Sequence, residues 1–114
     1  MEQIIAIKPG SSSLVLEGDK VLTIQKGRNM YNLGCATLID PSDDYRINVE
    51  ILRVSYCKLK NTPQTDLTLH GEKTWENLMD YLKTYFPDIK KDSTITIVRY
   101  RMKKDKKEDK GEGL

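Results

Sequence analysis

Hydrophobic and polar residues alternate along much of the chain, which is the period-two pattern of β-strands that bury one face. The pattern predicts strands at residues 3–7, 21–25, 33–39, 46–56 and 95–102. Residues that favour turns separate these segments: Lys8-Pro9-Gly10, Lys26-Gly27-Arg28-Asn29 and the acidic run at residues 40–44. The sequence therefore predicts a domain built mainly from strands.

The alternation changes phase inside the fourth predicted strand. Its apolar positions are Ile47, Val49 and Ile51, followed by Leu52, Val54 and Tyr56. A β-bulge is the simplest cause, because one extra residue turns every later side chain to the other face of the sheet. The last strand shows the same change between Ile97 and Val98. Two bulged strands predict a curved mixed sheet or small barrel of about five or six strands.

One segment has the spacing of an amphipathic helix, with apolar residues three or four positions apart. These residues are Trp75, Leu78, Met79, Leu82 and Tyr85. Thr74 suits the N-cap and Pro87 follows the end, so we predict a helix from about residue 74 to residue 86. A shorter helical turn is predicted at residues 14–16, and loops are predicted for the rest. Together with the strands, these helices define an α+β fold.

The string Pro9-Gly10-Ser11-Ser12-Ser13 precedes the short helix and permits two interpretations. Its glycine and serines suit a tight turn followed by an N-cap. The same residues also suit an anion-binding site, because backbone N–H groups point out of a helix N-terminus. The sequence alone leaves both open.

Length and charge divide the chain into one folded domain and a tail. The 114 residues suffice for one domain, and 38% of them are hydrophobic, so we predict a domain at residues 1–102. Residues 103–114 contain one apolar side chain and are predicted to be disordered. Basic residues gather where the last strand meets this tail: Arg99, Arg101, Lys103, Lys104, Lys106 and Lys107. They suit either contacts with nucleic-acid phosphates or solubility, since a net charge of +2 indicates no anionic partner by itself.

Other classes of protein are disfavoured by what the sequence lacks. No apolar run reaches the roughly 18 residues of a membrane span, and the first residues do not form a signal peptide, so we expect a soluble cytoplasmic protein without a membrane partner. Cys35 and Cys57 lack ligand spacing and are expected to be buried free thiols. With His70 as the single histidine and no nucleotide-binding motif, we expect neither a metal site nor a cofactor.

The order of the elements and the residues at their ends resemble a known family. Residues 3–102 contain, in order, Ile7-Lys8-Pro9-Gly10, Leu16-Glu17-Gly18-Asp19-Lys20, Tyr31-Asn32-Leu33-Gly34 and Tyr85-Phe86-Pro87-Asp88. The most specific part is Leu16-x-Gly18-x-Lys20-x-x-Thr23-Ile24, which is similar to the string L-x-G-x-K-T-x-T-I-R of the ASCH domain family. The chain therefore resembles ASCH domains, which are small PUA-like β-barrels.

The resemblance implies a cleft beside the barrel that binds RNA or a modified nucleoside. In some small bacterial members it implies an amidohydrolase that removes the acetyl group of N(4)-acetylcytidine with a lysine, a threonine and a glutamate. Lys20 and Thr23 match the lysine and the threonine. Residues three apart in a strand face opposite ways, so Lys20 has to lie on the turn that enters the strand if the two are to converge.

Three positions differ from the pattern of the family. Gln25 replaces the arginine that ends the string, and Cys35 replaces a polar or acidic residue. An ungapped comparison puts His70 at the position of the glutamate, with Glu72 two residues later. His70 suits either a general base or a solvated loop residue, and Glu72 suits either catalysis or the start of the following helix.

Three functions fit these observations. We favour a binding module for RNA or a modified nucleoside, and the alternative is an amidohydrolase acting on N(4)-acetylcytidine-like substrates. A structural or protein-interaction role is the third. The expected binding residues are Lys20, Thr23 and Gln25 in the cleft and Arg99, Arg101, Lys103 and Lys104 at the basic strand end, and the expected catalytic residues are Lys20, Thr23, His70 and Glu72. An acid or base within about 3 Å of the Lys20 amine or the Thr23 hydroxyl separates binding from catalysis.

Overall fold

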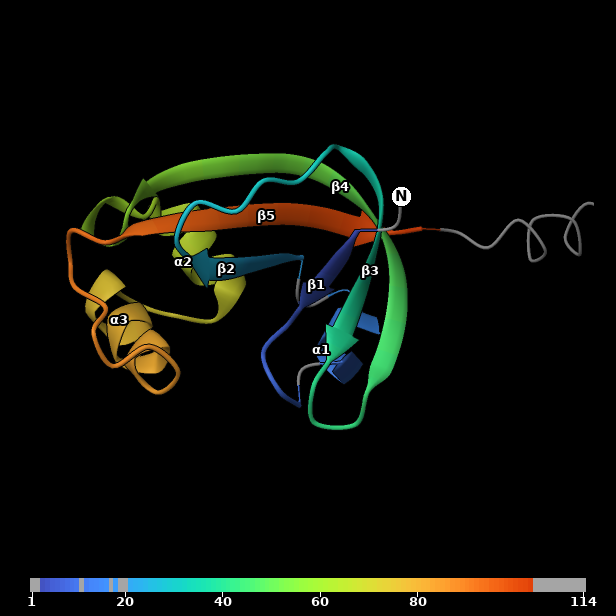
Figure 1. The fold of residues 1–114 in the computed structure, drawn as a ribbon, viewed down its shortest axis with the longest axis horizontal. Coiled ribbons are helices and arrows are strands. Elements are labelled where there is room, and N and C mark those ends of the chain that lie inside the picture. The colour runs from blue at the N-terminus through green and yellow to red at the C-terminus, as the bar shows by residue number, and fades with distance from the viewer. Residues whose placement is uncertain (1–2, 11, 17, 19–20, 104–114) are drawn as a thin grey trace, which may run out of the picture.

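The computed structural model describes residues 3–10, 12–16, 18 and 21–103 of the chain. Its elements are β1 (Ile4–Ala6), α1 (Ser12–Leu16), β2 (Leu22–Lys26), β3 (Gly34–Asp40), β4 (Tyr45–Lys58), the 3-10 turn η1 (Leu59–Asn61), α2 (Gln64–His70), α3 (Trp75–Lys83) and β5 (Thr94–Met102). The strands form one five-stranded sheet in the order β1-β3-β4-β5-β2. β1 and β3 are parallel, and the other neighbours are antiparallel. The sheet curls into a half-barrel, with α2 and α3 at the end opposite α1 (Figure 1), which confirms the predicted curved α+β fold.

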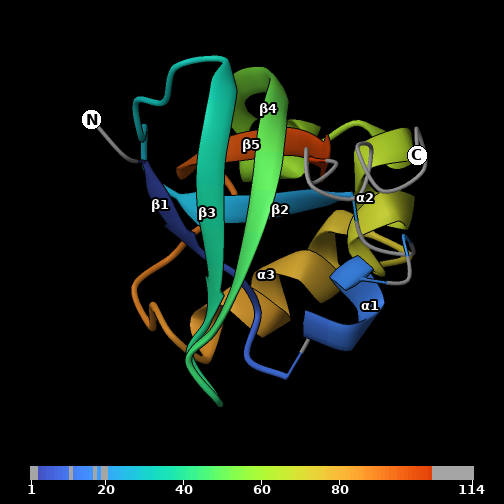
Figure 2. The same ribbon diagram turned by 90° about the vertical axis from the view of Figure 1, so that its right-hand side faces the viewer.

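The predicted bulge in β4 lies where the sheet curls. Ile51 pairs with Tyr100 and Arg53 pairs with Arg99, so Leu52 is one extra residue on β4. Figure 2 shows the first half of β4 and its neighbour β3 running across β5 and β2. A bulge increases the local twist and bends its strand, which accounts for this change of direction. The bulge predicted between Ile51 and Leu52 is therefore confirmed.

The second bulge, predicted in β5, is wrong. β5 pairs with β2 without a register shift over the whole length of β2. The apolar phase change arises because both faces of β5 are buried: Ile95 and Ile97 pack in one core cluster, and Val98 and Tyr100 pack in another. A strand that is covered on both faces loses the alternation of apolar and polar residues.

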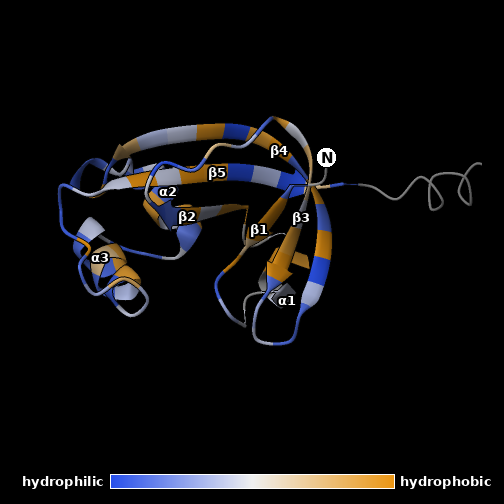
Figure 3. Cartoon of the chain, in the orientation of Figure 1, coloured by the Kyte–Doolittle hydropathy of each residue, from blue (hydrophilic) through white to orange (hydrophobic). Residues whose placement is uncertain are grey.

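Two clusters of buried apolar side chains form the core, one on each face of the curled sheet. The first joins β1, α1, β3 and the first half of β4, and the second joins β2 and the start of β5 to α2 and α3. Figure 3 shows apolar residues along both groups of elements. Fully buried members include Ile5, Leu38 and Val49 in the first cluster and Leu22, Leu78 and Ile95 in the second. The helices α2 and α3 are therefore fixed against one edge of the sheet.

The predicted long helix is present as α3, although its regular part ends at Lys83 rather than near residue 86. Thr74 is its N-cap, and the Thr74 hydroxyl accepts a hydrogen bond from the Asn77 N–H at 3.2 Å. Leu78 and Leu82 are buried in the second cluster. The apolar spacing and the cap that predicted this helix are thus the features that hold it in place.

The segment before α3 was predicted as a loop, but it forms α2. Pro63 precedes this helix, and Gly71, with a φ of 97°, ends it in the left-handed conformation that glycine tolerates. Two of its buried side chains, Asp66 and His70, are polar. The inner face of α2 therefore lacks a continuous apolar stripe, and the hydrophobic pattern does not indicate a helix there.

A buried carboxylate holds the turn between β1 and α1. Asp40 is fully buried, and its oxygens accept hydrogen bonds from the Gly10 N–H at 2.9 Å and the Ser12 N–H at 3.0 Å. The Ser42 hydroxyl donates to the same carboxylate at 2.7 Å, and with the backbone donors it holds the pKa of Asp40 well below its ordinary range. The anion at the start of this short helix is therefore the protein's own carboxylate.

Some predictions lie outside the described residues: the site roles of Lys20 and Lys104, and the disorder of the tail beyond Lys103. Among the residues that the structure describes, no helix is long and apolar enough to cross a membrane. The same residues contain no group of three or more His, Cys, Asp or Glu side chains placed to hold a metal ion. Both cysteines are free thiols as predicted, but Cys35 is exposed and Cys57 is half-buried, so their predicted burial is wrong.

Candidate functional site

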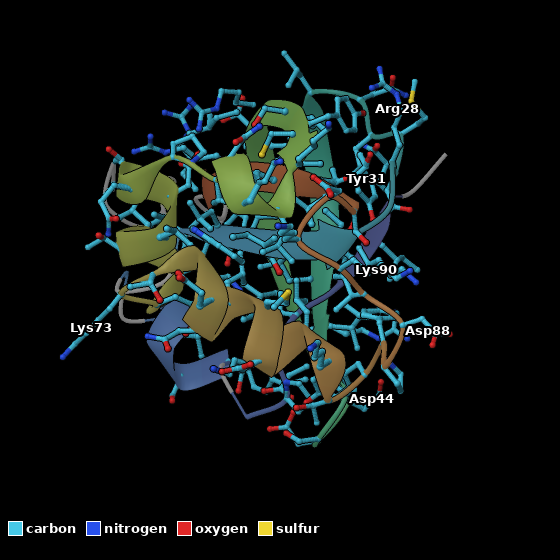
Figure 4. All side chains as sticks on the ribbon, turned by 90° about the vertical axis from the view of Figure 1, so that its left-hand side faces the viewer. Arg28, Tyr31, Asp44, Lys73, Asp88 and Lys90 are labelled. Atoms are coloured by element: carbon cyan, nitrogen blue, oxygen red, sulfur yellow. The ribbon has the colours of Figure 1, made fainter. Side chains whose placement is uncertain are left out.

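A pocket of about 560 Å³ lies between the two edge strands of the sheet and the end of α3. β1 and β2 do not pair with each other, so the half-barrel stays open along this side. The walls come from the end of β1 and the turn after it, from β2 and the loop after it, and from the last turn of α3 and the residues that follow it. Tyr31, from the loop after β2, lines the pocket, and Arg28 precedes it in the same loop (Figure 4).

The walls of the pocket are aromatic and cationic. Four aromatic residues line it: Tyr31, Tyr81, Tyr85 and Phe86. The Lys8 ammonium lies 4.5 Å from the centre of the Tyr81 ring, and the Lys26 ammonium lies 5.5 Å from the centre of the Phe86 ring. No aspartate or glutamate is among the described residues that line the pocket. Flat rings beside positive charges suit a planar ligand that carries polar or anionic groups.

Tyr81 joins the pocket to the helix α2. Its ring lies 5.6 Å from the Tyr85 ring and 5.7 Å from the His70 ring. Burial, with smaller contributions from Tyr85 and the Glu72 carboxylate, raises the pKa of Tyr81 to about 12. The Tyr81 hydroxyl therefore keeps its proton at neutral pH and remains able to donate a hydrogen bond.

Two of the predicted ligand residues, Thr23 and Gln25, lie in the wall that β2 contributes. They are two positions apart in the strand and thus project from the same face. Thr23 is 3% exposed, and its hydroxyl makes no hydrogen bond to a described residue. The Gln25 side-chain oxygen accepts hydrogen bonds from the Asn29 amide and the Tyr31 hydroxyl, both at 3.0 Å. Lys20, the third predicted residue, precedes this strand and lies outside the described residues.

His70 and Glu72 lie close to each other, and the His70 ring lies beside Tyr81. His70 is the last residue of α2 and is only 5% exposed, so the alternative of a solvated loop histidine is wrong. Its Nδ1 atom is 3.7 Å from a Glu72 carboxylate oxygen. Glu72 does not cap α3, because Thr74 holds that position. The structure thus pairs His70 with Glu72, while Thr23 and Gln25 occupy the pocket wall.

The basic residues near the end of β5 form a second candidate site. Arg99 is half-exposed, and it pairs across the sheet with Arg53. The Arg101 Nε atom donates a hydrogen bond to a Glu50 carboxylate oxygen at 2.8 Å, and the Arg101 Nη2 atom lies 2.7 Å from the same oxygen in an ion pair. The Lys103 ammonium is 2.9 Å from the Cys35 sulfur, a contact that raises the pKa of Lys103. Two of these three cations already have partners within the chain.

Several residues of the pocket were not predicted from the sequence, chiefly Lys8, Asn29, Tyr31 and Tyr81. Lys8 and Tyr31 belong to strings that carried the resemblance to ASCH domains, so their positions were marked but not their roles. Tyr81 and Asn29 gave no signal. Tyr81 lies outside the apolar spacing of α3, and Asn29 belongs to a turn whose composition is common.

Solved structures with a similar fold are known. No protein-family model and no curated protein matches the sequence. Protein EF3133 from Enterococcus faecalis V583, of the DUF984 family model, shares 10% identity with a TM-score of 0.67, covering 90% of this chain and 80% of its own. The ASCH domain from Lactobacillus crispatus JV V101 shares 14% identity with a TM-score of 0.67, covering 88% and 79%. The S128A mutant of the Zymomonas mobilis ASCH protein shares 14% identity with a TM-score of 0.59, covering 88% and 67%.

The chain therefore has an ASCH-like fold, as the sequence resemblance predicted. At these identities the likeness concerns the path of the backbone, and the site has to be judged from its own residues.

Proposed function

We propose that the protein is an ASCH-type binding module for RNA or a modified nucleoside, and that Thr23 and Gln25, with Lys20 beside them in sequence, contact the ligand. The observation that carries the proposal is the aromatic and cationic lining of the pocket at Thr23 and Gln25. Stacking on aromatic rings and hydrogen bonds to base edges are the usual means by which proteins recognise single-stranded RNA and free bases. No cofactor is part of the proposal.

The basic end of β5 extends the proposed ligand from a nucleoside to RNA. Arg99, Arg101, Lys103 and Lys104 would contact phosphates, while the pocket holds a base. Phosphate contacts contribute affinity that depends on salt and carries no sequence information, whereas base contacts carry the specificity. Binding of a nucleoside alone should therefore depend little on salt, and binding of RNA should depend on it strongly.

A titration of the full chain with cytidine, N(4)-acetylcytidine and a short single-stranded RNA tests the proposal. Thr23→Val keeps the β-branched shape and removes the hydroxyl, and we expect it to weaken nucleoside binding about tenfold, the value of about one hydrogen bond. Thr94→Val is the matched control, because Thr94 is exposed at the start of β5 and is not among the residues that line the pocket. Equal affinities in the two variants and the wild type would assign the ligand to another surface.

A second candidate is amidohydrolysis of an N(4)-acetylcytidine-like substrate, favoured by the pair formed by the buried His70 and the half-buried Glu72 beside Tyr81. A histidine held by a carboxylate is a common general base. This activity needs Lys20 and Thr23 to reach the same substrate. Turnover of N(4)-acetylcytidine by the wild type that is lost in Thr23→Val, Lys20→Met and His70→Gln would establish it, and we expect binding without turnover.

A further inference from the structure

A chain of hydrogen bonds runs from the buried centre of β5 to the pocket. The Thr96 side chain is fully buried, and its hydroxyl donates to the Gly27 carbonyl oxygen at 2.6 Å. The same hydroxyl accepts a hydrogen bond from the Asn29 N–H at 2.9 Å. The Tyr56 hydroxyl donates to the Asn29 carbonyl oxygen at 3.0 Å. The backbone of Asn29 is therefore held from both sides.

The Asn29 side chain is oriented by the same strand end. Its amide nitrogen donates to the Lys26 carbonyl oxygen at 3.2 Å and to the Gln25 side-chain oxygen at 3.0 Å. A backbone carbonyl only accepts hydrogen bonds, so the NH₂ group of Asn29 has to lie on that side. This contact settles which end of the Asn29 amide faces Gln25.

The orientation of Gln25 follows from that of Asn29. Its side-chain oxygen accepts from the Asn29 amide and from the Tyr31 hydroxyl, so both of its lone pairs are used. Rotating the Gln25 amide by half a turn would place two NH₂ groups against each other. The Gln25 NH₂ group is thus left on the other side, and it makes no hydrogen bond to any residue that the structure describes.

We propose that Gln25 is a specificity-determining residue that offers only hydrogen-bond donors to the ligand, and that it selects bases with an unprotonated ring nitrogen on their Watson–Crick edge. The inference rests on the proposed function and narrows its ligand class. Cytosine has such an acceptor at ring position 3 and adenine at ring position 1, whereas uracil and hypoxanthine carry an N–H there. A site whose donor meets another donor loses its hydrogen bond on both sides, which is how polar sites discriminate between close analogues.

The residue type at this position is what makes the selection possible. An arginine, which is usual in the ASCH string, would also donate, but it would bring a positive charge that favours anionic groups. Glutamine has no charge, and the hydrogen bonds from Asn29 and Tyr31 to its oxygen orient its NH₂ group. The pocket is therefore able to distinguish two neutral bases of nearly equal size.

The decisive variant is Gln25→Glu, which keeps the length of the side chain and replaces the NH₂ group with an acceptor. One carboxylate oxygen still accepts from Asn29 and Tyr31, and the other faces the pocket. The experiment compares the dissociation constants of the full-length wild type, Gln25→Glu and the control Gln64→Glu for cytidine, uridine, adenosine and inosine. Gln64 lies on the exposed side of α2 and is not among the residues that line the pocket, so its substitution matches the change of charge.

We expect the wild type and Gln64→Glu to bind cytidine or adenosine about tenfold more tightly than uridine or inosine, and Gln25→Glu to reverse that order. The two pairs separate a pyrimidine ligand from a purine ligand. Tyr31→Phe, which removes one of the two donors that hold Gln25, should keep binding and reduce the discrimination.

The failures of the two proposals differ. If the wild type binds nucleosides and Gln25→Glu has the same ratio of affinities for cytidine over uridine and for adenosine over inosine, the role of Gln25 is overturned while the binding function stands. If Gln25→Glu does not fold, as judged by circular dichroism, the Tyr31→Phe variant decides. An affinity ratio within each nucleoside pair that equals the wild-type ratio then overturns the inference. If the wild type binds none of the four nucleosides, the role of Gln25 is overturned, and the binding function is overturned as well if N(4)-acetylcytidine and single-stranded RNA also fail to bind.

Discussion

The pocket wall on β2 and the basic end of β5 both present polar side chains to solvent, but they hold them in opposite ways. At the pocket, Gln25 is oriented by neutral hydrogen bonds that trace back to the buried Thr96. At the strand end, the side chain of Arg101 is 66% exposed and is tied to Glu50. Oriented neutral donors discriminate between ligands, whereas exposed charges contribute attraction that salt screens. We therefore expect the pocket to set specificity and the strand end to set salt-dependent affinity.

The largest expected effect comes from removing the support of the pocket. Leu78 is a fully buried residue of α3, the helix that closes one wall of the pocket. Leu78→Ala should lower the free energy of unfolding by about 2–5 kcal/mol, because it leaves a cavity in the core, and should weaken nucleoside binding as α3 loosens. Leu52→Ala is the control at the exposed bulge and should change stability by less than about 0.5 kcal/mol. Urea unfolding followed by circular dichroism measures both, and equal losses would refute the placement of Leu78.

Asp40 offers the next test, because its carboxylate holds the turn that carries Lys8 and Pro9 into the pocket wall. Its pKa in the folded state lies below the ordinary value of about 3.9, so the carboxylate stabilises the fold above that pH. That stability is lost as the pH falls below about 4 toward the folded pKa. We expect the melting temperature of the wild type to fall over this range.

Asp40→Asn removes the charge at nearly constant size, so its melting temperature should be lower at pH 7 and should fall less on acidification. Asp44→Asn, in the same turn region and exposed, is the control. If the melting temperatures of the wild type and Asp40→Asn fall by the same amount from pH 7 to pH 2, the Asp40 carboxylate contributes nothing to the loss of stability in acid.

The elements that the sequence predicted are those whose pattern is local. The strands and the β4 bulge follow from alternation and its change of phase, and α3 follows from apolar spacing after a threonine cap. α2 was missed because its inner face carries Asp66, which pairs with Arg53 at 3.1 Å, in addition to His70. A buried polar residue is tolerated only with such a partner, and no local pattern in the sequence identifies the partner.

In the candidate site, too, the features with a local pattern were predicted and those that depend on distant segments were not. Thr23 and Gln25 were found because the strand repeat and the ASCH string fix their positions. The orientation of Gln25 depends on Asn29 and Tyr31, which belong to a loop, and on Thr96, far along the chain. Cys35 was expected inside, but it is exposed and lies opposite Glu50 on β4. Both facts depend on which segments the curled sheet brings together.

The tail gives a smaller effect that concerns the strand end alone. Deleting residues 104–114 should leave the melting temperature nearly unchanged, because these residues lack apolar side chains apart from Leu114. The deletion should reduce the salt dependence of RNA binding by about 0.7 of a logarithmic unit for each lost phosphate contact with a single strand. Nucleoside affinity should stay constant. Measuring RNA affinity between low and physiological salt checks this, and an identical slope after deletion would assign the tail to solubility.

The smallest expected effect is at the ion pair itself. Glu50→Gln releases Arg101, so RNA affinity at low salt should rise and the salt dependence should increase by less than about one logarithmic unit. Stability should change by less than about 1 kcal/mol, as is usual for exposed pairs. Glu76→Gln on α3 removes an equal charge away from β5 and serves as control. The same rise in both variants would mean that net charge, rather than the release of Arg101, is responsible.

We expect the base to bind in the pocket at Thr23 and Gln25, and not at the basic end of β5. A map of ¹H–¹⁵N chemical-shift changes on adding cytidine or adenosine tests it most directly. We expect changes at Thr23, Gln25, Asn29 and Tyr81, including the side-chain NH₂ of Gln25, and none at Glu50 or Arg101. Changes confined to Glu50, Arg101 and Lys103, or a spectrum that stays the same at saturating nucleoside, would contradict it.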